Sequence, residues 1–83
     1  MNITIDCTHI RTREDLYAAM DRSLPLPCGH SLDALHDVLT SITGTIRLEG
    51  WEEACAALGK YGQAAKKAVA HAALENEKLD ILF

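Results

Sequence analysis

Two short Cys-x-His pairs are the residues of this chain that come closest to metal chemistry. They occupy residues 7–9 (Cys-Thr-His) and 28–30 (Cys-Gly-His). Two thiolates and two imidazoles would complete a tetrahedral zinc site, but the spacing of the two pairs is not that of a usual zinc finger. The simpler interpretation is a buried cysteine at a strand end and a loop cysteine beside surface histidines. We therefore expect no metal and no cofactor, and keep a small zinc-binding or redox protein as an alternative.

Catalytic chemistry would need a nucleophile, a base or a metal held by its neighbours. The chain has no Gly-rich phosphate loop and no nucleophile elbow. Its histidines are scattered along the sequence, at His9, His30, His36 and His71. The sequence therefore predicts a protein that is not an enzyme.

A more informative pattern lies between residues 32 and 42, where Asp33, His36, Asp37 and Thr40 share one face of an expected helix. Like charges four residues apart cost an isolated helix about 0.2–0.5 kcal/mol. Asp33 lies in the first turn, where a carboxylate complements the helix dipole, and it could also pair with His36. Asp37 lies beyond that turn, and no lysine or arginine occurs from residue 23 to 46. This acidic face is therefore either a plain solvated surface or a contact for a basic partner.

Length and composition favour one small domain, residues 1–83, that binds protein rather than nucleic acid. The net charge of −4 lacks the excess of lysine and arginine that phosphate binding needs. The three cysteines are an odd number, which favours free thiols in a reducing compartment. No apolar run reaches the ~20 residues of a bilayer span, and the N-terminus has no secretory pattern. We expect a cytoplasmic protein without membrane contact.

Apolar periodicity and Gly or Pro punctuation predict the elements that must position these residues. A strand at 2–6 precedes a helix capped by Thr12 and stopped by the sequence LPLP at 24–27. Ser31 caps the helix at 32–42, whose leucines form its core face. Four further elements follow, namely a strand at 45–49, a helix that Gly50 opens and Gly59 closes, a helix at 62–77 and a strand at 79–83. The order β-α-α-β-α-α-β predicts an α/β fold with a three-stranded parallel sheet and four helices.

The run Gly29-x-Ser31-Leu32-Asp33-Ala34-Leu35-x-Asp37-x-Leu39 resembles the barstar family of ribonuclease inhibitors. That family typically has Tyr-Gly-x-Asn-Leu-Asp-Ala-Leu-Trp-Asp at this place. The likeness extends weakly over nearly the whole chain, and the order of elements agrees. The resemblance implies an intracellular inhibitor whose second helix and preceding loop fill the phosphate-binding cleft of a secreted basic ribonuclease.

In that family, acidic side chains stand in for RNA phosphates, and by position Asp33 and Asp37 match the two helix aspartates. Gly29 matches the loop glycine. The chain departs from the family pattern where Cys28 replaces tyrosine, Ser31 replaces asparagine and His36 replaces tryptophan. An acidic residue of the family's last helix falls near Ala72, with Glu75 and Asn76 close by.

Our principal hypothesis is an immunity protein of a bacterial toxin–antitoxin pair that binds a basic nuclease or other toxin protein. The alternative is an interaction module of the same fold with a partner unrelated to nucleases. In either case we expect the partner to contact the acidic helix and the loop before it, through Cys28, Gly29, His30, Ser31, Asp33, His36, Asp37 and Thr40.

Overall fold

The computed structural model describes all residues, 1–83, and confirms the predicted order β-α-α-β-α-α-β. A three-stranded parallel sheet and four helices make up the fold, as the sequence predicts. The elements are β1 (Asn2–Asp6), α1 (Arg13–Ser23), α2 (Leu32–Leu39), β2 (Gly44–Glu49), α3 (Trp51–Leu58), α4 (Lys60–Glu75) and β3 (Leu79–Leu82).

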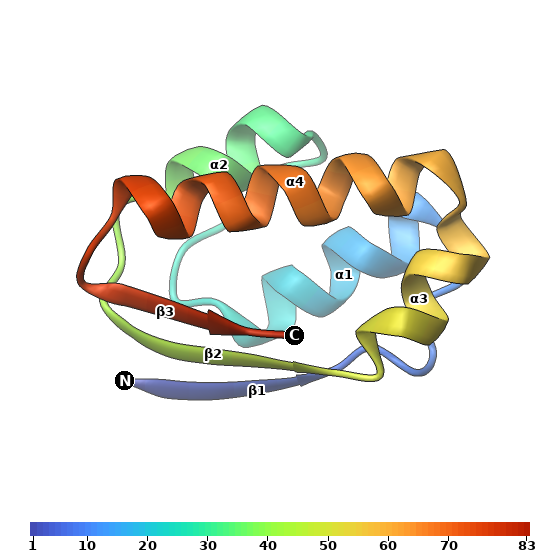
Figure 1. The fold of residues 1–83 in the computed structure, drawn as a ribbon, viewed down its shortest axis with the longest axis horizontal. Coiled ribbons are helices and arrows are strands. Elements are labelled where there is room, and N and C mark those ends of the chain that lie inside the picture. Colours follow the sequence, from blue (N-terminus) through green and yellow to red (C-terminus); the bar gives the residue numbers. More distant parts are fainter.

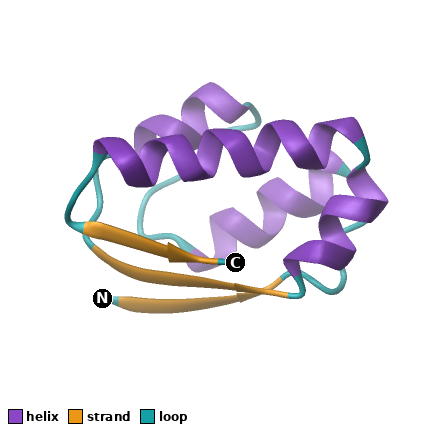
Figure 2. Ribbon diagram, viewed as in Figure 1, coloured by secondary structure: helices purple, strands orange, loops and turns teal.

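The sheet has the order β1-β2-β3, and its strands carry helices on one face only (Figures 1 and 2). Ile5 of β1 pairs in register with Leu48 of β2, and Ile46 pairs with Ile81 of β3. Residues that alternate with these apolar positions, such as Arg47 and Asp80, are exposed. The alternation of strand side chains therefore separates a core face from a face open to solvent.

The core lies between the sheet and the helices and contains one cluster of 21 buried residues. Helix α2 contributes Leu35 and Leu39 to this core, and both are buried. Leu32, at the start of the helix, is only half-buried. The buried face of α4 is made mainly of small residues, including Ala65 and Ala72. Such residues allow α2 and α4 to pack closely, which sets the position of the acidic helix.

The predicted boundaries of two helices are wrong, at the end of α2 and at both ends of α4. Helix α2 ends at Leu39 rather than at residue 42, because the hydroxyls of Thr40 and Ser41 donate to the carbonyl of Asp37 and the chain turns there. The N–H of Ser41 bonds to the carbonyl of Val38, which tightens the last turn. Helix α4 begins at residue 60, directly after Gly59, and ends at Glu75.

Candidate protein-binding surface on helix α2

Asp33 and Asp37 lie exposed on the outer face of α2. The side chain of Asp37 is 87% exposed, and its one ion-pair contact within 4.0 Å is with Nδ1 of His36, at 4.0 Å. All ion-pair contacts within 4.0 Å in this protein involve a histidine, and none involves a lysine or arginine. The two carboxylates therefore present negative charge that no lysine or arginine of the chain neutralises.

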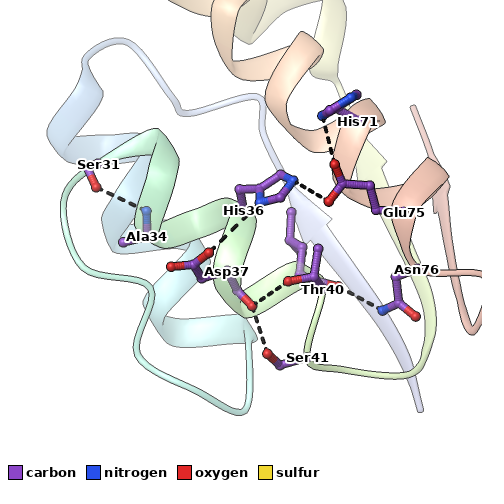
Figure 3. A network of polar contacts seen from close by, with 10 residues as sticks. Ser31, Ala34, His36, Asp37, Thr40, Ser41, His71, Glu75 and Asn76 are labelled. Carbon is purple, nitrogen blue, oxygen red and sulfur yellow. Dashed lines mark hydrogen bonds and ion pairs between the residues drawn. The ribbon is translucent and has the colours of Figure 1, made fainter.

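Helix α2 is positioned from its first residue by a side-chain cap. The N–H of Ala34 donates to Oγ of Ser31 at 3.1 Å, and Ser31 has extended backbone geometry (Figure 3). Leu35 fixes the opposite face of the helix in the core. This arrangement holds Asp33 in the first turn, where the helix dipole favours it.

The loop before α2 is fastened to α1 by Cys28. Its N–H and its thiol donate to Oδ1 of Asp21 at 3.0 and 3.1 Å. The Cys28 side chain is fully buried, so it has no surface to offer to a partner, contrary to its place among the expected contact residues. Gly29 follows with φ +64°, and a Cβ there would lie 3.1 Å from Cβ of Ala34. A glycine at this position lets the loop turn tightly into the helix.

His30 is the exposed ring of the loop. It stands edge-on to the buried Tyr17, with ring centroids 6.0 Å apart and planes at 78°. Leu26, on the other side of Cys28, is 43% exposed and is the large apolar side chain that this loop presents to solvent. The loop therefore offers one apolar and one imidazole side chain next to the acidic helix.

Thr40 terminates α2 and is only half-buried. Its hydroxyl donates to the carbonyl of Asp37 at 2.9 Å, so this group already has a hydrogen-bond partner within the helix. The amide of Asn76, at the end of α4, donates to the carbonyls of Leu39 at 2.9 Å and Ile42 at 2.7 Å. These bonds fix the C-terminal end of the acidic helix.

His36 contacts Glu75 and not Asp33, the partner that the spacing within α2 would also have allowed. Its Nε2 lies 3.2 Å from a carboxylate oxygen of Glu75 on α4, and its side chain is only 27% exposed (Figure 3). Glu75 also contacts His71, at 3.4 Å. Glu75 and His71 were not predicted as members of this surface, although their spacing of four residues places both on one face of α4.

The Cys-x-His pairs do not form a zinc site, because no three of their ligand atoms lie close enough together to share a metal ion. The thiol of Cys7 is buried and donates to the carbonyl of Ile5, whereas the thiol of Cys28 donates to Asp21. Burial raises the pKa of the Cys7 thiol to about 11 and that of the Cys28 thiol to about 12. Both thiols are therefore protonated near neutral pH.

Comparison with known protein families gives a match over the full chain. The family model described as barstar (barnase inhibitor) matches residues 1–83, the whole chain. A search of curated proteins finds no significant match. None of the helices combines the length and apolar composition needed to cross a membrane.

Proposed function

The chain belongs to the barstar family, and we propose that it inhibits a basic ribonuclease by placing α2 and the loop before it in the enzyme's substrate cleft. Such a cleft carries lysine or arginine for the phosphates of RNA. Asp33 and Asp37 would occupy the positions of two phosphates there. Inhibition of a secreted toxin while it is still inside the producing cell is the immunity function that this arrangement would serve.

The observation that carries the proposal is the unneutralised and exposed state of Asp37. Its side chain is not needed for packing or capping, because it is 87% exposed and the helix-end bonds use its backbone carbonyl. In a complex, the carboxylate can reach a cation of the partner without first breaking an ion pair to lysine or arginine. An acidic face of this kind also attracts a basic partner over long range.

The loop determines which ribonuclease fits. Aromatic side chains are frequent anchors in protein interfaces, and this loop offers Leu26 and His30 in their place. His36, in the position where the family has tryptophan, is turned toward Glu75. The proposed target is therefore a basic ribonuclease whose cleft accepts a smaller apolar side chain and an imidazole.

The test measures inhibition of RNA cleavage and binding for a panel of basic ribonucleases that includes barnase. The panel is assayed against wild type, Asp37→Ala and the matched control Asp80→Ala. Asp80 is exposed on the solvent face of the sheet. Each of the two variants removes one carboxylate, so they change the net charge equally. We expect potent inhibition of at least one enzyme by wild type and Asp80→Ala, and a large loss for Asp37→Ala.

Equal inhibition by the two variants would show that α2 is not the contact surface. Inhibition of no basic ribonuclease would favour the second candidate, a module of the same fold that binds another protein. Co-expression gives the cellular counterpart, because an immunity protein rescues the growth of cells that make the toxic enzyme and its Asp37→Ala variant does not.

A further inference from the structure

Three side chains with metal-ligating atoms meet where α2 packs against α4. His36 comes from α2, and His71 and Glu75 come from α4 (Figure 3). Nε2 of His36 lies 3.2 Å from one oxygen of Glu75, and Nδ1 of His71 lies 3.4 Å from the other. One ligand atom from each residue lies within 4.8 Å of the others.

The fold brings these atoms together through two independent constraints. The spacing of four residues puts His71 and Glu75 on one face of α4, one turn apart. Ala72 lies between His71 and Glu75 in the sequence and is completely buried. Its small side chain lets α2 approach α4 closely. The imidazole of His36 then lies against the ring of His71, with centroids 5.9 Å apart and planes at 31°.

We propose that His36, His71 and Glu75 bind one divalent transition-metal ion, with Zn²⁺ as the best match. Two imidazoles and one carboxylate are a donor set that zinc uses with three protein ligands, and they leave a fourth position for water or another ligand. This inference does not depend on inhibition of a ribonuclease.

The spacing of the three atoms supports the assignment. Zinc bonds of 2.0–2.2 Å in a tetrahedron place donor atoms about 3.3–3.5 Å apart. Each imidazole nitrogen already lies at about that spacing from Glu75, Nε2 of His36 at 3.2 Å from one carboxylate oxygen and Nδ1 of His71 at 3.4 Å from the other. A shared ion would be held by both oxygens, or by one oxygen after a small turn of the carboxylate. The separation of at most 4.8 Å closes by rotation of the His71 side chain, which is 65% exposed and free to adjust.

The surroundings of His36 also fit a metal ligand. Its Nε2 faces the cluster, whereas its Nδ1 faces Asp37 at 4.0 Å. At that distance the carboxylate of Asp37 makes no hydrogen bond to the ring, but it adds negative charge beside the cluster, which favours a bound cation. No lysine or arginine lies within ion-pair distance of Glu75 or Asp37 to oppose a cation. A bound ion would clamp α2 onto α4.

The experiment titrates Zn²⁺ by calorimetry into protein without a polyhistidine tag, in a non-chelating buffer near neutral pH. The variants are His71→Ala and Glu75→Gln, which alter exposed side chains and leave the core intact. His9→Ala is the matched control, because His9 is 90% exposed and belongs to none of these contacts. Cys55→Ser is the second control, because Cys55 is the one cysteine that is not fully buried.

We expect wild type, His9→Ala and Cys55→Ser to bind one equivalent of Zn²⁺ and to melt at a higher temperature when it is bound. His71→Ala and Glu75→Gln should each bind at least tenfold more weakly, since loss of supporting contacts alone weakens metal sites by that much. Metal-free melting temperatures of all variants show that they are folded.

A second measurement identifies the ligands directly. Addition of Zn²⁺ should shift the imidazole NMR signals of His36 and His71 and leave those of His9 in place. Absence of saturable binding, equal affinity in wild type and His71→Ala, or loss of binding in Cys55→Ser would each overturn the proposal.

Discussion

Asp21 at the end of α1 holds Cys28 through two hydrogen bonds to one carboxylate oxygen, from the backbone N–H at 3.0 Å and from the thiol at 3.1 Å. This relationship spans seven residues and fixes the loop that leads into the acidic helix. The small buried thiol of Cys28 is well placed to reach Asp21 from this position. The loop is therefore anchored to the last turn of α1.

The first prediction concerns the pH dependence of that anchor. Hydrogen bonds from the side chain and backbone of Cys28, with a smaller contribution from the charge of His30, lower the pKa of Asp21 below its ordinary value of 3.8. The ionised carboxylate therefore stabilises the folded loop above pH 4, and that stabilisation is lost as pH falls through the lowered pKa. NMR shifts of residues 26–31 should move in this acid range for wild type.

The matched variant is Asp21→Asn, which keeps the size of the side chain and removes its charge. The NMR signals of its loop should show no transition in the acid pH range where Asp21 of the wild type is protonated. At neutral pH these signals should already differ from those of the wild type. A loop transition that persists unchanged in this variant would contradict the role of the carboxylate.

A second prediction concerns Asn76, which ties the end of α4 to the end of α2. Its amide donates to the carbonyls of Leu39 and Ile42. Asn76→Ala leaves both carbonyls without that partner, and we expect the free energy of unfolding to fall by about 1–3 kcal/mol. Urea unfolding measures this change. Asn2→Ala, on an exposed strand residue, is the control and should alter stability much less.

A third prediction separates the stability of α2 from its binding. Asp37→Ala should change the free energy of unfolding by less than about 0.5 kcal/mol, as expected for an exposed side chain. Its affinity for the target ribonuclease should fall by about 2–5 kcal/mol, a scale that rests in part on complexes of this same family and is not a measurement on this chain. Calorimetric titration with the inhibited enzyme measures the loss.

The same acidic face should accelerate association. We expect the association rate of wild type to fall as ionic strength rises, because salt screens long-range attraction between exposed charges. Stopped-flow measurements at low and high salt test this for wild type, Asp37→Ala and Asp80→Ala. A rate that is independent of salt would mean that electrostatic steering has no part in binding.

A fourth prediction concerns thiol reactivity. Desolvation raises the pKa of Cys7 to about 11 and of Cys28 to about 12, and both side chains are fully buried. Cys55 is partly exposed. At pH 8, one thiol per chain should react rapidly with a disulfide reagent in the native protein, and all three should react after denaturation. Rapid labelling of native Cys28 would show that the loop opens.

The sequence by itself determined the elements and the direction in which each one faces. Alternating β-branched residues at 2–6 indicated a strand, and the leucine stripe around Leu35 and Leu39 indicated the buried face of α2. The opposite face, with Asp33 and Asp37, was therefore predicted correctly from the sequence alone. These features are local, because a period of two or 3.6 residues places side chains on faces whatever the element packs against.

Only the tertiary structure decided what those faces meet. Cys28 turned inward to Asp21, and the amide of Asn76 from the end of α4 fixed the C-terminal end of α2. His36 contacts Glu75, which lies 39 positions farther along the chain, rather than the nearby Asp33. Periodicity within α2 or α4 contains neither the angle nor the offset at which the two helices pack. Those quantities come from the combined packing of the core, so the cluster of His36, His71 and Glu75 exists only in the folded chain.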